Sequence, residues 1–210
     1  MNKEDNTKMF DIVKRKELVR HAHEKGFEDF FIVNEDILLI SESDTKKLRK
    51  EILDARKKGQ IVVVLGNNDL VNRFAIESKV DILLSPEFAR KKDFPDYRNS
   101  GLNQVLCREA AENNVAIGIN LSDILHLEGI EKSLRLGRIM QNVRLCIKFH
   151  VPVILATFAE IEAELRNSDE LISFGISLGM SRKEAEDALI EIKRKIKKRD
   201  TYESKSYPKI

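Results

Sequence analysis

The fold is decided between residues 80 and 158 by three short apolar runs: Asp81-Ile-Leu-Leu84, Val115-Ala-Ile-Gly-Ile119 and Pro152-Val-Ile-Leu-Ala156. A polar residue that can end a strand or cap a helix follows each run, and segments with helical periodicity separate the runs. A parallel sheet covered by helices on both faces needs short, continuous apolar strands of this kind. This stretch therefore predicts an α/β fold with buried parallel strands.

The chain before residue 80 continues the same alternation. Apolar runs at residues 10–13, 29–33, 37–40 and 60–65 are each typical of a strand. The complete pattern has about seven strands, and their spacing indicates βα units rather than hairpins. It is compatible with a TIM-like (β/α) barrel, either regular or irregular and incomplete, because eight full units need about 250 residues. A doubly wound open sheet is the alternative.

We expect a single α/β barrel domain over residues 9–199. The polar residues 1–8 are expected to form a flexible N-terminus, and residues 200–210 a flexible C-terminal tail. No apolar run approaches the ~18 residues of a membrane span, and the first residues do not resemble a signal peptide. The isolated Cys107 and Cys146 are interpreted as structural thiols of a reducing compartment. These features predict a soluble, cytoplasmic protein without a membrane partner.

The charge balance of the chain is close to neutral. Charged residues make up 34% of the sequence, but the net charge is only +2. A typical nucleic-acid-binding domain carries a larger basic excess. Any surface that binds a polyanion must therefore arise from local segregation of charge.

Such segregation occurs in the predicted helix Leu134-Arg-Leu-Gly-Arg-Ile-Met-Gln-Asn-Val-Arg-Leu-Cys-Ile-Lys148. Its apolar positions recur with helical spacing and form one stripe toward the core. Acidic residues are nearly absent from its other faces, and arginine both grips phosphate and stacks on bases. A contact with another protein and an ordinary solvated face are the alternatives. The residues that we predict to contact RNA are Arg135, Arg138, Asn142, Arg144 and Lys148.

A second basic cluster surrounds the segment Asp93-Phe-Pro-Asp-Tyr-Arg98. Aromatic side chains interleave with cations here, as they often do in RNA-binding loops, although two aspartates dilute the charge. The segment follows the first of the three apolar runs, so it should lie on the C-terminal rim of a barrel, which is the usual functional face. The predicted RNA contacts in this cluster are Arg90, Lys91, Lys92 and Arg98.

No catalytic or metal-binding set is evident in the sequence. His21-Ala-His23 resembles the metal-binding pair of some barrel hydrolases, but it lies in a helical pattern, where residues two apart diverge by about 200°. The many carboxylates show no convincing pair at successive strand ends. Neither glycine-rich nucleotide fingerprint is present. We therefore predict no catalytic residues and no metal ligands in this chain.

Residues 161–180 are unusually rich in apolar side chains. Ile172, Ile176 and Met180 form one helical stripe, and a second stripe lies beside it. Two stripes are more than one helix needs to dock on a barrel. A chain that buries both stripes in its own core is the alternative. The second stripe, which we predict to face another protein subunit, consists of Leu171, Phe174 and Leu178.

An ordered series of motifs resembles the archaeal ribonuclease P protein component 3 family, which is related to a eukaryotic ribonuclease P subunit. The resemblance extends over residues 9–190 and is denser after residue 80. The motifs that carry it are Ser100-Gly-Leu-Asn-Gln-Val-Leu106, Asn114-Val-Ala-Ile-Gly-Ile-Asn120, Arg138-Ile-Met-Gln-Asn-Val-Arg144, Val151-Pro-Val-Ile-Leu-Ala-Thr157 and Arg166-Asn-Ser-Asp169, followed by Gly175, Gly179-Met-Ser181 and Ala185.

The resemblance implies a barrel that serves as a protein subunit of ribonuclease P, the endonuclease that removes the 5′ leader from precursor tRNA. In that family the RNA subunit performs the hydrolysis with Mg²⁺, so the resemblance implies no cofactor on the protein. It implies the ribonuclease P RNA, other ribonuclease P protein subunits and precursor tRNA as partners. The competing interpretation is a barrel metal-dependent hydrolase or phosphoesterase, which would bind metal and turn over substrate alone.

Overall fold

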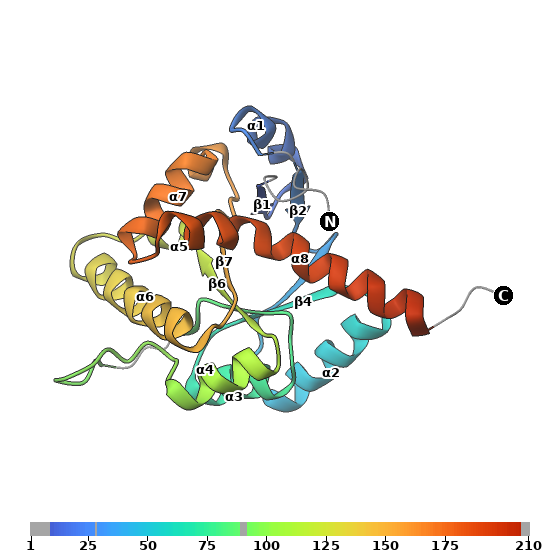
Figure 1. The fold of residues 1–210 in the computed structure, drawn as a ribbon, viewed down its shortest axis with the longest axis horizontal. Coiled ribbons are helices and arrows are strands. Elements are labelled where there is room, and N and C mark those ends of the chain that lie inside the picture. The colour runs from blue at the N-terminus through green and yellow to red at the C-terminus, as the bar shows by residue number, and fades with distance from the viewer. Residues whose placement is uncertain (1–8, 28, 89–91, 207–210) are drawn as a thin grey trace.

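Strands and helices alternate along most of the chain in the computed structural model, which describes residues 9–27, 29–88 and 92–206 (Figure 1). The strands within this part are β1 (Phe10–Val13), β2 (Asp29–Ile32), β3 (Ile37–Ile40), β4 (Ile61–Leu65), β5 (Ile82–Leu84), β6 (Ala116–Asn120) and β7 (Val153–Ala156). The α-helices are α1 (Val19–Glu24), α2 (Thr45–Lys57), α3 (Asp69–Glu77), α4 (Gln104–Glu112), α5 (Leu121–Leu125), α6 (Gly129–Phe149), α7 (Ser168–Ser177) and α8 (Arg182–Ser206). Short 3-10 helices are η2 (Lys16–Leu18), η3 (Pro86–Phe88) and η4 (Glu162–Glu164).

Asparagine side chains start three of the helices that come after strands. Asn68, Asn103 and Asn120 precede α3, α4 and α5, and each accepts a hydrogen bond from a backbone N–H in the first turn of its helix. Such a cap satisfies an N–H group that has no partner within the helix. Asn68 and Asn120 thus place a polar side chain close to the carboxyl ends of β4 and β6, whereas Asn103 comes after η3.

All strand pairs are parallel, as predicted. β1 pairs with β2, and a five-stranded sheet has the order β3-β4-β5-β6-β7. Isolated bridges from Val13 to Ala159 and from Val33 to Ile37 join the two sheets at both edges. The strands thus form a closed ring rather than a doubly wound open sheet, which confirms the TIM-like barrel. The barrel is irregular, because β2 and β3 follow each other without a helix between them.

A buried carboxylate lies at the seam between β1 and the end of β7. The Asp11 carboxylate accepts hydrogen bonds from Thr157 N at 2.7 Å, from Thr157 Oγ1 at 2.5 Å and from Ile12 N at 2.8 Å. Burial raises the pKa of Asp11 to about 6 against the opposing effect of these hydrogen bonds. The role of Asp11 was not predicted, although an aspartate inside an apolar strand indicates a buried polar contact.

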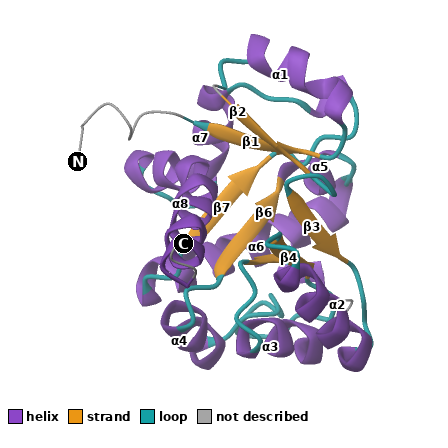
Figure 2. Cartoon of the chain, turned by 90° about the vertical axis from the view of Figure 1, so that its right-hand side faces the viewer, coloured by secondary structure: helices purple, strands orange, loops and turns teal. Residues whose placement is uncertain are grey.

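Helix α8 closes the end of the barrel at which the strands begin. Ile192 and Ile196 of this helix join the apolar interior of the barrel, and the Lys193 ammonium lies 4.9 Å from the centre of the Phe10 ring. Lys195 Nζ donates a hydrogen bond to the Asn114 carbonyl, just before β6. Figure 2 shows the strands enclosed by helices. With α8 at this end, the carboxyl ends of the strands are left as the face available for a functional site.

The boundaries of the domain differ in one respect from the prediction. α8 continues to Ser206, beyond the expected boundary at residue 199, whereas residues 1–8 and 207–210 lie outside the described part of the chain. Cys107 and Cys146 are free thiols buried in the apolar layer of α4 and α6, as predicted. Across the described residues, no helix is long and apolar enough to cross a membrane.

The predicted partner face on α7 is largely core. Leu171 and Leu178 have almost no exposed surface and pack in one apolar cluster with Ile172 and Met180, while Phe174 is partly buried against the same cluster. The prediction of a subunit interface is therefore wrong for Leu171 and Leu178. The reason is that α7 packs between the barrel and a neighbouring helix, so residues of both stripes find partners within the chain and only Ile176 stays exposed among the six residues of the two stripes.

Candidate nucleic-acid interface

The loop formed by residues 92–99 lies against helix α6 and projects beyond the helical layer at the lower left of Figure 1. Asp93 anchors it. The Asp93 carboxylate accepts hydrogen bonds from Arg138 Nε at 2.8 Å, Arg98 Nη1 at 3.0 Å and Asn99 N at 2.9 Å. Burial alone would raise the pKa of Asp93, but the hydrogen bonds from Asn99, Arg98 and Arg138 outweigh burial and lower it. The loop is thus tied to α6 by an ionised carboxylate.

A second anchor comes from the α6 side chain Gln141. Its amide oxygen accepts from Arg98 N at 2.9 Å, and its amide nitrogen donates to Arg98 O at 2.7 Å and to Ser100 Oγ at 2.8 Å. Gly137 leaves room for the Arg98 side chain to approach the helix closely, because a Cβ at residue 137 would be 3.1 Å from Arg98 Nε. The Arg98 backbone and its guanidinium are therefore both held in place.

Two aromatic rings are exposed at the tip of this loop. The Phe94 N–H donates to Tyr97 O at 3.0 Å and closes a tight hairpin. The two rings stack with centroids 4.5 Å apart and an interplanar angle of 22°. A groove of about 540 Å³ runs between the hairpin and α6, lined by residues 94–98 and by Gly137, Met140, Gln141 and Arg144.

Beneath the loop, a buried carboxyl group faces the side of α6. Glu87 of η3 is almost fully buried, and burial raises its pKa from an ordinary 4.5 to about 7, against the opposing effects of a backbone hydrogen bond, Arg135 and Asn142. The Arg135 guanidinium lies over the Phe88 ring, 4.1 Å from its centre. Asn142 Oδ1 has no hydrogen-bond donor among the described residues.

The raised pKa of Glu87 makes stability depend on pH. The folded state keeps the Glu87 proton up to about pH 7, whereas the unfolded chain loses it near pH 4.5. The contribution of protonated Glu87 to the free energy of unfolding is therefore fully present below pH 4.5 and is lost as the pH rises through 7. Replacing Glu87 with Gln, which resembles the protonated acid, is expected to raise the free energy of unfolding at pH 8 by on the order of 3 kcal/mol and to change little at pH 4.5.

Urea unfolding of the Glu87→Gln variant and of the parent protein between pH 4.5 and 8 measures this difference. Glu51→Gln, on the exposed face of α2, is the matched control and should follow the parent profile. Equal stability of the Glu87→Gln variant and the parent at pH 8 would show that folding does not raise the pKa of Glu87.

The predicted RNA-contacting residues fall into three groups. Lys92, Arg98, Arg144 and Lys148 are exposed. Arg90 and Lys91 lie outside the described residues. The others, Arg135, Arg138 and Asn142, share one face of α6 as the helical spacing predicted, but η3 and the 92–99 loop cover that face.

Asn142 is therefore a correction to the predicted set. It is only 3% exposed, and its amide donates to Ser100 O at 3.0 Å. Arg138 is held against Asp93, so it supports the loop rather than facing solvent. A helical wheel shows which side chains share a face, but it does not show which part of the chain covers that face. The anchoring roles of Asp93, Gln141 and Ser100 were likewise missed, because their partners are distant in sequence.

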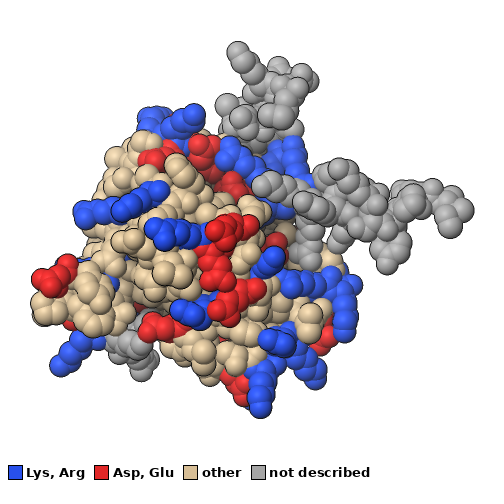
Figure 3. All heavy atoms as spheres, turned by 60° about the horizontal axis from the view of Figure 1, so that its bottom comes forward, with Lys and Arg blue, Asp and Glu red and all other residues tan. Residues whose placement is uncertain are grey.

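Basic and acidic side chains alternate over much of the surface. Figure 3 shows Lys and Arg around the edges of one face and a band of Asp and Glu across its middle. This distribution agrees with the net charge of +2. A polyanion would therefore be bound by a local patch rather than by a whole face of the protein.

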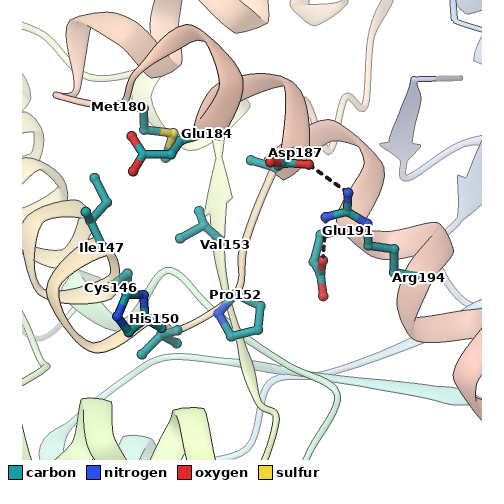
Figure 4. Close-up of a pocket in the computed structure, with 12 residues that line it drawn as sticks. Cys146, Ile147, His150, Pro152, Val153, Met180, Glu184, Asp187, Glu191 and Arg194 are labelled. Atoms are coloured by element: carbon teal, nitrogen blue, oxygen red, sulfur yellow. Dashed lines mark hydrogen bonds and ion pairs between the residues drawn. The ribbon is translucent and has the colours of Figure 1, made fainter. Parts of the chain in front are cut away.

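A second cavity, of about 280 Å³, lies between the end of α6 and α8 (Figure 4). Ile147 and Val153 contribute to its apolar wall. Asp187 and Glu191 both point at Arg194, with oxygen–nitrogen distances of 2.7 and 3.4 Å. Acidic side chains line this cavity, so its charge does not suit a phosphate group.

The His21-Ala-His23 pair lies on α1, in the helical segment that the sequence predicted. His21 Nδ1 is 3.6 Å from Glu162 Oε1, whereas the His23 ring packs edge-on against Phe30, with centroids 4.9 Å apart. The two rings therefore have separate surroundings. Among the described residues, no group of three or more His, Cys, Asp or Glu side chains could hold a metal ion.

Comparison with known proteins identifies relatives along most of this chain. Ribonuclease P protein component 3 of Methanosarcina mazei is 36% identical over 177 residues, which are 84% of this chain and 69% of that protein. A chain of archaeal ribonuclease P, solved by cryo-EM with mature tRNA, is 26% identical with a TM-score of 0.70 and covers 91% of this chain and 81% of its own.

Hydrolases share only the fold. The crystal structure of phenylurea hydrolase B matches 77% of this chain and 44% of its own with a TM-score of 0.57, at 16% identity. This likeness supports the barrel but not the competing interpretation as a metal-dependent hydrolase. The family model for RNase P subunit p30 matches residues 38–205, which include α6, the 92–99 loop and most of the barrel. By this match and by its archaeal relatives, the chain belongs to the RNase P subunit p30 family.

Proposed function

We propose that this protein is a subunit of ribonuclease P and supports removal of the 5′ leader from precursor tRNA. The observation that carries this proposal is the likeness to a chain of archaeal ribonuclease P over 91% of the present chain. Its proposed partners are the ribonuclease P RNA, other ribonuclease P protein subunits and, as substrate of the complex, precursor tRNA. Its proposed location is the cytoplasm.

We further propose that the RNA subunit, with Mg²⁺, performs the hydrolysis and that this chain binds no cofactor. The engagement of several carboxylates in structural contacts supports this division of roles. Asp11 accepts three hydrogen bonds at the barrel seam, and Asp93 holds two arginines. Glu87 is buried under the loop with a pKa of about 7. Asp11 and Asp93 are therefore engaged in contacts within the protein itself.

The exposed cations of α6 and of the 92–99 loop are the proposed RNA contacts. Lys92, Arg144 and Lys148 are exposed on this surface, Arg98 is exposed while paired with Asp93, and the predicted Arg90 and Lys91 remain part of the proposal. Arginine and lysine bind phosphates and release condensed counterions, so their contribution falls with rising salt. Arg135 and Arg138 lie beneath this surface and stabilise it, Arg135 by stacking on Phe88 and Arg138 by its ion pair with Asp93.

Reconstitution with the cognate ribonuclease P RNA and protein subunits tests this function. We expect the complete assembly to cleave precursor tRNA, omission of this subunit to reduce cleavage, and the purified RNA-free protein to cleave nothing. Cleavage by the RNA-free protein that a substitution in this chain abolishes would assign the catalysis to the protein. Full activity without this subunit would remove its proposed role.

The same assembly locates the RNA surface. Replacing Lys92, Arg144 and Lys148 together with Ala should reduce the slope of log K against log salt by up to about 2 to 3, since each lost phosphate contact removes nearly one released counterion. Replacing Lys46, Lys47 and Lys50 of α2 with Ala removes the same charge elsewhere and serves as the control. Equal slopes for the two triple variants would show that α6 is not the RNA surface.

A further inference from the structure

The hairpin of residues 94–97 presents a ready stacking surface. Phe94 and Tyr97 cover one face of each other's ring, yet they remain 49% and 57% exposed, so each has an outer face open to solvent. Adjoining apolar surface of this kind commonly marks an interaction site. Aromatic faces bind nucleobases with little dependence on sequence, because every base has a π-face.

The hairpin is organised before any ligand arrives. The hydrogen bond from Phe94 N to Tyr97 O closes it, and the contacts of Asp93 and Gln141 fix its base on α6. Binding therefore does not have to order the loop, and this reduces the entropic cost of association. A flexible loop with the same residues would bind more weakly.

The groove beside the rings has the size and charge for a nucleotide. Its volume of about 540 Å³ lies within the range of roughly 300–1,000 Å³ that is usual for ligand sites. Arg98, Arg144 and Asp96 all line the groove, and Asp96 lies within the hairpin, between Phe94 and Tyr97. Phosphate is therefore favoured near the two arginines and disfavoured at the tip, where the ring faces are exposed.

From this arrangement we propose that the hairpin binds an unpaired base of RNA by stacking on Phe94 or Tyr97, with its backbone phosphate toward Arg98 and Arg144. The inference rests on the proposed function and adds to it the kind of RNA that this surface takes. An unpaired segment is required, because bases within an RNA helix do not offer their faces to side chains.

The variants Phe94→Leu and Tyr97→Leu, made together, test the proposal in the full-length protein. Leucine keeps apolar bulk but removes the π-face. Affinity for the cognate ribonuclease P RNA at fixed salt should fall by about 5- to 100-fold, the change that corresponds to losing one stacked base. The salt slope should stay unchanged, because no charge is removed. Leu70→Ala, at a position 63% exposed on α3, is the matched control and should bind as the parent does.

The outcomes separate this inference from the function on which it rests. Parent-like affinity of the folded leucine variant, while reconstituted cleavage still requires this subunit, would overturn the stacking site alone. Failure of reconstitution to require this subunit would overturn the proposed function. Loss of binding to another protein subunit, with RNA affinity intact, would make the hairpin a protein contact and also overturn the stacking site.

A second measurement does not depend on the folding of a variant. Ribonuclease P RNA that carries 4-thiouridine is expected to cross-link, on irradiation, to the peptide containing residues 94–97, at an unpaired nucleotide. Cross-links that avoid this peptide while forming elsewhere on the protein, or that map only to paired nucleotides, would contradict the proposal.

Discussion

Replacing Leu171 with Asp is expected to unfold the protein, whereas replacing Ile176 with Asp is not. Leu171 has no exposed surface in the apolar cluster of α7, but Ile176, on the same helix, is 44% exposed. Removing a buried leucine costs about 2–5 kcal/mol, and burying a carboxyl group adds several more. The sum is comparable to the whole stability of a typical domain, about 5–15 kcal/mol.

Circular dichroism and thermal melting of the two variants measure this difference. The Ile176→Asp variant controls for the low helix propensity of aspartate, and its melting temperature should fall by only a few degrees. A Leu171→Asp variant that stays folded with parent-like melting would mean that α7 does not pack on the barrel through this side chain.

Replacing Gly101 with Ala is expected to lower the free energy of unfolding by about 4 kcal/mol, through backbone strain and overpacking. Gly101 has a φ of +77°, and a Cβ on it would lie 2.0 Å from the Pro86 carbonyl oxygen. The Asn72 amide donates to both Pro86 O and Gly101 O, at 2.9 and 3.2 Å, so these segments cannot separate without losing that bridge. The substitution would displace η3, which carries Glu87.

Gly26→Ala is the matched control for this substitution. Gly26 has a similar φ of +86°, but a Cβ there would meet nothing within 4 Å. Only the cost of a positive φ at alanine remains, which lowers the free energy of unfolding by about 1 kcal/mol. Urea unfolding of both variants isolates the close approach of Gly101 to Pro86. Equal losses at the two positions would show that this contact is looser than described.

The strands were predictable because a buried parallel strand is apolar on both faces. The run at residues 37–40 coincides with β3, and the run at residues 152–156 contains β7. Closure of the barrel was harder to predict, because an open sheet has the same local pattern. Closure depends on the bridge from Val13 to Ala159, a contact between residues far apart in sequence. Family resemblance, rather than periodicity, favoured the barrel.

The candidate site was predictable in its position but not in its construction. The sequence predicted an aromatic loop on the C-terminal rim of the barrel and a separate basic helix, and the two are in contact. It treated Asp93 as a charge that dilutes the basic cluster, but this residue holds Arg98 and Arg138 in place. Local spacing cannot reveal such a role, because Asp93 and Arg138 belong to separate elements that only the tertiary fold brings together.

The position of α8 also has a consequence for the synthesis of this protein. All the strands leave the ribosome before residues 192–196, whose isoleucines cover the apolar interior at the start of the barrel. Until those residues emerge, the nascent chain exposes that interior, which includes Ile61 and Val63. Transiently exposed apolar surface of this kind is prone to aggregation and attracts chaperones. Translation that stops shortly before residue 192 would therefore produce a chain that contains all the strands but leaves the apolar interior of the barrel exposed to solvent at one end.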